Sequence, residues 1–190
     1  MSTDFPCPAT RDEIGPQTKR MCEMIEQTVI GYEPFFDVRL FVFPEFAHAA
    51  PIYDRVAKLQ SHLAVPVPNE HTDSYARLAA RLGCYIQTGT FIETDPAYPD
   101  AVFNTTVLIG PTGVLSKYRK VNPWIPWELH SSPHDIASYP DDPFPVVETE
   151  IGPSLELVKL NNPTGQVVNG NTIVYTISVS NESGVPATGV

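Results

Sequence analysis

The 190-residue sequence is poor in basic residues and contains no long apolar run. Twelve Lys and Arg stand against 22 Asp and Glu, so the formal net charge is −10. That charge repels phosphate backbones and anionic lipid, which argues against nucleic acid and membrane surfaces as partners. No apolar run approaches the ~18 residues of a spanning helix. Residues 1–10 also lack the basic and apolar regions of a secretory signal.

Cysteine is scarce and proline is abundant, and each observation excludes a class of protein. Cys7, Cys22 and Cys84 are widely spaced and form no CxxC pair, which is typical of reduced thiols in the cytoplasm. Proline accounts for 20 residues, about twice the usual ~5%. A long helical bundle is therefore excluded, because proline breaks helix interiors. The apolar content of 42% predicts a folded core.

Apolar periodicity predicts an α/β order in the first two thirds of the chain. Gly and Pro positions and the spacing of apolar residues predict three helices, over residues 12–30, 49–63 and 74–82. Short β-branched and aromatic runs predict four strands, over residues 38–43, 84–90, 102–109 and 114–118. Helices alternating with strands are typical of an α/β fold in which the helices pack on a sheet.

The chain changes character twice after residue 122. Residues 123–153 contain seven of the 20 prolines, which predicts irregular structure. Residues 173–180 then alternate apolar and polar, which predicts a half-buried strand, with residues 155–160 as its antiparallel partner. We therefore predict a domain over residues 1–153 and a short antiparallel β segment over residues 154–190.

Glu45 is the first candidate for chemistry. It follows a predicted strand in an α/β order, and sites usually form at the carboxyl ends of such strands. Its neighbours Phe43 and Phe46 are expected to remove the carboxylate from water, which favours a general base. The alternative is an exposed loop glutamate that caps the next helix.

Lys120 and Glu128 are the next candidates. Lys120 ends the predicted hairpin and is followed by two tryptophans, so its ammonium is placed to stabilise a developing oxyanion. Glu128 lies eight residues further on and is expected to pair with that ammonium. The alternatives are a solvated basic cluster for Lys120 and a surface carboxylate for Glu128.

Two stretches together resemble motifs of the nitrilase superfamily of carbon–nitrogen hydrolases. One is Phe43-Pro44-Glu45-Phe46, and the other runs from Lys117 to Glu128 and is similar to the aliphatic amidase branch. The resemblance covers residues 12–152 and implies a partial α-β-β-α sandwich. It also implies no cofactor, a small linear amide or nitrile as substrate, and a homo-oligomer.

The resemblance also implies a role for each site residue. Glu45 would be the general base, Lys120 would stabilise the tetrahedral intermediate, and Glu128 would orient the site. Phe46 and Trp124 would border the substrate. The family's third catalytic group is a cysteine, expected within about a residue of Lys159, and no cysteine follows Cys84. Because acyl transfer from an amide needs an activated nucleophile, we expect little or no turnover from this chain.

Residues 154–190 resemble the first half of a conserved-repeat domain of bacterial surface proteins, a small immunoglobulin-like β-sandwich.

A metal site is not expected, because Pro133 argues against the helix that would bring His130 and His134 to one face. The leading hypothesis is thus an amidase-like hydrolase that lacks its nucleophile. The alternatives are a non-catalytic structural or interaction protein, and a truncated fusion.

Overall fold

The computed structural model describes residues 7–124, 127–137, 139–153, 157–162 and 174–179. The chain divides into two compact units, Met1–Pro145 and Val146–Val190, and each is described by itself. The domain boundary near Pro153 stays a prediction. None of the described helices has the length and apolar character needed to cross a membrane.

Helices α1 and α3 form the main helical layer of the first unit. Helix α1 spans Ile14–Tyr32 after a short 3-10 helix, η1 (Arg11–Glu13), and α3 spans Glu70–Leu82. The shorter α2 (Val56–His62) begins seven residues later than predicted, because the backbone of Arg55 is extended, with φ −144° and ψ 140°. A second 3-10 helix, η2, covers Pro133–Asp135.

Helix α3 begins four residues before the predicted start at Ser74. Its N-cap, Asn69, accepts hydrogen bonds from the backbone N–H groups of His71 and Thr72, and the Thr72 hydroxyl accepts one from the Asn69 N–H. This capping box satisfies the first orphan donors of the helix. The predicted stop at Gly83 is confirmed, since that residue adopts a left-handed φ of 64°.

Five strands form a mixed sheet. They are β1 (Leu40–Val42), β2 (Tyr85–Gln87), β3 (Phe91–Glu93), β4 (Phe103–Gly110) and β5 (Gly113–Arg119). Strand β1 runs parallel to β2, and β4 is antiparallel to β2, β3 and β5. The predicted β4–β5 hairpin is confirmed. Strand β3 was not predicted, because its residues directly follow residues 84–90, which were interpreted as a single strand.

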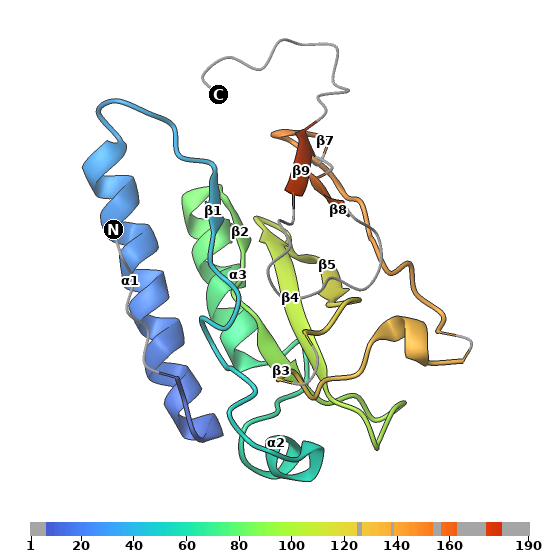
Figure 1. Cartoon of the computed structure of the whole chain (residues 1–190). Coiled ribbons are helices and arrows are strands. Elements are labelled where there is room, and N and C mark those ends of the chain that lie inside the picture. The colour runs from blue at the N-terminus through green and yellow to red at the C-terminus, as the bar shows by residue number, and fades with distance from the viewer. Residues whose placement is uncertain (1–6, 125–126, 138, 154–156, 163–173, 180–190) are drawn as a thin grey trace. The chain divides into compact units, whose positions relative to one another are not determined.

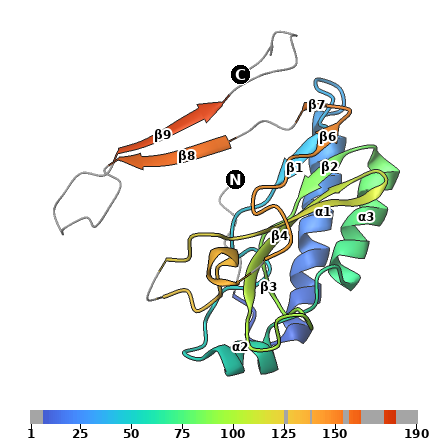
Figure 2. The same cartoon turned by 90° about the vertical axis from the view of Figure 1, so that its right-hand side faces the viewer.

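Helices α1 and α3 lie side by side against the sheet (Figure 1, Figure 2). Their apolar stripes, spaced three or four residues apart, supply much of the core. Each large side chain buried there contributes roughly 1.5–3 kcal/mol. The fully buried large apolar residues are Ile14, Met21, Ile25, Leu59, Leu63, Tyr75, Ile86, Phe91, Ile92, Phe103 and Ile109. This arrangement is the α/β fold class that the sequence predicts.

The second unit contains two small antiparallel pairs. Strand β6 (Glu148–Thr149) pairs with β7 (Gly152–Pro153), and β8 (Leu157–Asn162) pairs with β9 (Val174–Val179). The predicted pairing of residues 155–160 with residues 173–180 is confirmed for the described residues. Lys159 lies in β8, opposite Ile177. The immunoglobulin-like resemblance stays a prediction.

Candidate active site

Glu45 lies in a turn that leaves the carboxyl end of β1. Pro44 lies two residues beyond the end of β1, and its carbonyl accepts a hydrogen bond of 3.3 Å from the Ala47 N–H. This end of a parallel strand is where α/β folds usually place a site. The Glu45 side chain is 41% exposed, so Phe43 and Phe46 cover it less than the sequence predicts.

Lys120 reaches the same place from the end of β5. Its backbone N–H donates to the carbonyl of Asn104 on β4 at 2.8 Å, which fixes the residue just beyond the hairpin. Its Nζ donates to Glu45 Oε1 at 2.7 Å. Asn104 also donates from its Nδ2 to the same oxygen at 2.8 Å. Glu45 Oε1 is therefore held by two donors, one charged and one neutral.

Glu128 completes the cluster and is almost fully buried, with 5% of its side chain exposed. Its Oε1 accepts from Lys120 Nζ at 2.8 Å, and its Oε2 accepts from the Trp124 backbone N–H at 2.5 Å. The chain beyond it is tied back to the start of β4, since the Ser131 N–H donates to the Val102 carbonyl at 2.7 Å. The structure thus brings together the three predicted catalytic residues, although Glu45 is 75 residues away from Lys120.

The contacts within the cluster favour the charged forms of Lys120 and Glu128. Burial alone would lower the pKa of Lys120, but its hydrogen bonds to Glu128 and Glu45 outweigh burial and raise the pKa above its ordinary value. Burial would likewise raise the pKa of Glu128, but Lys120 and the Trp124 N–H lower it below its ordinary value. Two carboxylates share one ammonium, so the cluster carries a charge of −1.

The two residues predicted to border a substrate lie at the cluster in different ways. The Phe46 ring centroid is 5.9 Å from Lys120 Nζ, so this side chain does adjoin the ammonium. Trp124 contacts the cluster through its backbone N–H, and 69% of the residue is exposed. A substrate contact for either ring stays a prediction.

Sequence reasoning did not assign two further residues to the site, Asn104 and His130. Asn104 is a polar residue inside the buried strand β4, and its Oδ1 has no hydrogen-bond partner among the described residues. His130 is buried, both ring nitrogens lack such a partner there, and Nε2 lies 3.8 Å from Glu128 Oε2. Burial lowers the pKa of His130, so the ring is neutral at pH 7. The available signal for Asn104 was the presence of a polar asparagine inside a strand that was predicted to be buried.

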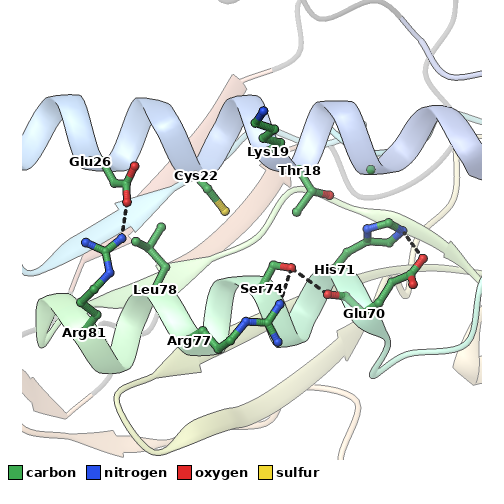
Figure 3. A pocket seen from close by; sticks show the side chains of 11 residues that line it. Thr18, Lys19, Cys22, Glu26, Glu70, His71, Ser74, Arg77, Leu78 and Arg81 are labelled. Atoms are coloured by element: carbon green, nitrogen blue, oxygen red, sulfur yellow. Dashed lines mark hydrogen bonds and ion pairs between the residues drawn. The ribbon is translucent and has the colours of Figure 1, made fainter.

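Neither Cys22 nor Cys84 offers a thiolate to this cluster at neutral pH. Cys22 points into a groove of about 590 Å³ between α1 and α3, whose lining includes none of the three cluster residues (Figure 3). Burial, with Glu26 nearby, raises the pKa of the Cys22 thiol to about 11. Burial also raises the pKa of Cys84, so both thiols are protonated at neutral pH. All three cysteines are free.

Solved structures define the fold class. Nit3 of Saccharomyces cerevisiae, a member of the nitrilase superfamily, aligns with a TM-score of 0.58 at 19% identity, covering 78% of this chain and 50% of Nit3. An N-terminal amidase crystallised with an Asn-Glu-Ala peptide aligns with a TM-score of 0.54 at 12% identity, covering 92% of this chain and 38% of the amidase. At such identities the similarity establishes the nitrilase-type fold.

The sequence establishes the family. A carbon–nitrogen hydrolase family model matches residues 12–176, so the chain belongs to the carbon–nitrogen hydrolase family. Formamidases of Bacillus thuringiensis (strain Al Hakam) and Bacillus cereus (strain AH820) are each 31% identical over 129 residues, which is 65% of this chain. The match covers 36% of each formamidase, so the chain spans about a third of the curated relatives it matches.

Proposed function

We propose that this chain carries the acid–base and oxyanion-binding groups of an amidase-type site for small linear amides or nitriles. The observation that supports it is the position of Lys120 Nζ, 2.7 Å from Glu45 and 2.8 Å from Glu128. A lysine kept charged by two carboxylates is suited to stabilise negative charge on a carbonyl oxygen. Membership of a family of carbon–nitrogen hydrolases, and the formamidase relatives, favour an amide as substrate.

Each member of the cluster has a role in this proposal. Glu45 is the general base, since it is the more exposed carboxylate and can reach a group arriving from solvent. Lys120 stabilises the tetrahedral intermediate. Glu128, buried and held by the Trp124 N–H, fixes the direction of the ammonium. Phe46 and Trp124 border the amide.

The nucleophile is the part of this chemistry that the chain does not carry in the expected place. Hydrolysis through an acyl-enzyme needs an activated thiolate that attacks the amide carbon. Cys22 and Cys84 have raised pKa values, and no cysteine follows Cys84 in the sequence. We therefore propose that the chain by itself binds a small amide without turning it over at a useful rate.

The remaining parts of the proposal concern surroundings and assembly. Three free cysteines in no disulfide fit a reducing compartment, and we propose the cytoplasm. A second candidate function is that of a non-catalytic interaction protein. Exposed apolar residues on and before the short strand β1 favour it, because such edges attract partners. They are Phe35, Phe36, Leu40 and Val42.

Binding and turnover separate these functions. Acetamide or formamide is titrated into the chain by NMR while ammonia release is followed, and we expect shifts of the Lys120 and Asn104 signals without ammonia. Lys120→Met should abolish the shift of the Asn104 signal. Lys58→Met is the matched control, because Lys58 has a 2.8 Å ion pair with Asp54 on the surface. No binding would contradict the amidase proposal, and turnover lost in Glu45→Gln would contradict the missing-nucleophile part.

A further inference from the structure

The turn that carries Glu45 rests on a break in the sheet between β2 and β3. We propose that Gly89 and Thr90, which lie in this break, are positioning residues for Glu45 and act through the backbone of residues 44–47. This inference rests on the proposed function, because it assigns two residues to the same site.

The break exists because β2 and β3 pair with different parts of the same edge of β4. Strand β2 pairs with Leu108 and Ile109, β3 pairs with residues 103–105, and β5 takes the other edge. Between them the Thr88 N–H donates to the Val107 carbonyl at 3.0 Å, and the Thr88 hydroxyl accepts from the Val107 N–H at 3.1 Å. The next two residues are therefore free to contact another segment.

That segment is the turn after β1. Thr90 holds it by accepting hydrogen bonds from two backbone N–H groups of the turn. Its hydroxyl accepts from the Phe46 N–H at 2.9 Å, and its carbonyl accepts from the Ala49 N–H at 3.3 Å. The Phe46 N–H belongs to the peptide that directly follows Glu45. The first bond therefore fixes the peptide that joins Glu45 to Phe46, and with it the backbone position of Glu45.

The conformation of the turn needs such support. Phe46 has a φ of 64°, in the left-handed region that residues with large side chains rarely adopt. A backbone in this region persists only where its surroundings hold it there. The Thr90 hydroxyl supplies the hydrogen bond at the strained residue itself.

Gly89 supplies the space. A Cβ at this position would lie 2.4 Å from the Cβ of Ala47 and 2.8 Å from the carbonyl oxygen of Pro44. Both atoms belong to the turn, and one of them is backbone, so any side chain at residue 89 would displace the turn. Only glycine allows the turn to pack directly on the break in the sheet.

A displaced turn would separate Glu45 from its partners. Its Oε1 accepts from Lys120 Nζ at 2.7 Å and from Asn104 Nδ2 at 2.8 Å, and both donors are fixed to the β4–β5 hairpin. A movement of about 1 Å would stretch both contacts beyond hydrogen-bond distance. The distance between general base and ammonium thus depends on Gly89 and Thr90, which touch neither group.

The test measures the pKa of Lys120, which Glu45 and Glu128 raise. The chain has five lysines, so 13Cε-lysine NMR resolves each one, and Lys120 is assigned by the signal lost in Lys120→Arg. Glu45→Gln sets the full fall in this pKa that the loss of one carboxylate causes. Thr90→Val removes the hydroxyl with little change in shape, Thr90→Ser restores it, and Gly89→Ala adds the clashing Cβ. Thr88→Val is the matched control, because it removes the same type of bond from the sheet.

We expect Thr90→Val and Gly89→Ala each to lower the Lys120 pKa by at least half of the Glu45→Gln fall. Thr90→Ser and Thr88→Val should leave it at the wild-type value. A wild-type pKa in Thr90→Val, or an equal fall in Thr88→Val, overturns the positioning role. If Glu45→Gln itself causes no fall, the ion pair and the proposed function fail first. Should Thr90→Val not fold, Thr90→Ala is judged by the same criterion.

Discussion

Two ion-pair clusters begin at neighbouring residues of one hairpin, and they differ in burial. Arg119 is 2% exposed and pairs with Glu93, which is 1% exposed, through its Nε at 2.8 Å and its Nη2 at 2.7 Å. Lys120 is the next residue and pairs with the partly exposed Glu45. Arg119 is the last residue of β5 and Lys120 lies just beyond it, so adjacent cations serve two separate clusters.

The Arg119 cluster is saturated. Glu93 also accepts from Lys117 Nζ at 2.8 Å and from the Thr105 hydroxyl at 2.5 Å, and Asp95 accepts from Arg119 Nη2 at 2.5 Å. Two acids and two bases make the cluster neutral. The guanidinium lies 4.0 Å from the centroid of the Phe103 ring, so its face is covered as well.

The Lys120 cluster is not saturated. It carries one more acid than base, and the buried atoms beside it, Asn104 Oδ1 and both nitrogens of His130, lack partners among the described residues. Unsatisfied buried groups are costly and often mark a functional place. We call the saturated Arg119 cluster closed, and we call the Lys120 cluster, beside which buried polar atoms lack partners among the described residues, open.

The largest expected effect is loss of stability when the closed cluster is broken. Glu93→Gln leaves the buried Arg119 with Asp95 as its remaining partner, and Arg119→Met leaves Glu93 with Lys117. Each substitution removes the best-buried pair of the cluster, so each should cost unfolding free energy near the lower end of about 3–5 kcal/mol. Urea unfolding measures it. Glu45→Gln, at the exposed end of the open cluster, should cost about 1 kcal/mol or less. Equal losses in the two clusters would remove the distinction between them.

Overpacking beneath the Glu45 turn should have the next largest effect. Gly89→Ala places a Cβ against Ala47 and Pro44, which should cost about 1–3 kcal/mol. Gly31→Ala is the matched control, since nothing lies within 4 Å of a Cβ at that position of α1. That variant should be neutral or stabilise by up to about 1 kcal/mol. Thermal unfolding of both variants checks the difference.

The open cluster should also limit stability at both ends of the pH scale. The pKa of Glu128 is lowered, so its contribution is present above ~4.3 and is lost as the pH falls through the folded value. The pKa of Lys120 is raised, so its contribution is present below ~10.4 and is lost as the pH rises through the folded value. Urea unfolding across this range should show both losses.

Lys120→Met is the control for this pH dependence. It removes the alkaline loss and weakens the acid one, because Glu128 then lacks its charged partner. An unchanged profile would mean that other groups titrate in these windows.

The smallest expected effect is at His130. His130→Leu removes two buried nitrogens that have no partner among the described residues, so stability should stay within about 1 kcal/mol of the wild type. Differential scanning calorimetry measures the shift. A loss above about 2 kcal/mol would show that His130 makes a stabilising hydrogen bond.

The sequence predicted the order of elements better than their limits. The stripe of α3 and the turn after Ile109 were readable because both depend on residues a few positions apart. The predicted helix start at Ala49 was wrong, since the Ala49 N–H donates to the carbonyl of Thr90, 41 residues away. Strand β3 was missed, because its residues directly follow the predicted strand 84–90 and its pairing with β4 is a long-range contact.

The candidate site divides in the same way. Glu45, Lys120 and Glu128 were proposed because each lies in a recognisable motif, and the structure brings them together. The expected burial of Glu45 between two phenylalanines did not follow, because neighbours in sequence do not determine what covers a turn. Asn104 and His130 were not assigned to the site, since their importance depends on which side chains the fold places beside them.

Three features could be established from the amino-acid sequence by itself. They are the α/β order of the elements, the lack of a cysteine after Cys84 in this sequence, and the motifs typical of the family. These are properties of composition and short-range spacing. Only the tertiary structure decided that Lys120 belongs to an open cluster and its neighbour Arg119 to a closed one. The reason is physical: burial and ion pairing depend on contacts across tens of residues, and those contacts arise only when the sheet is assembled.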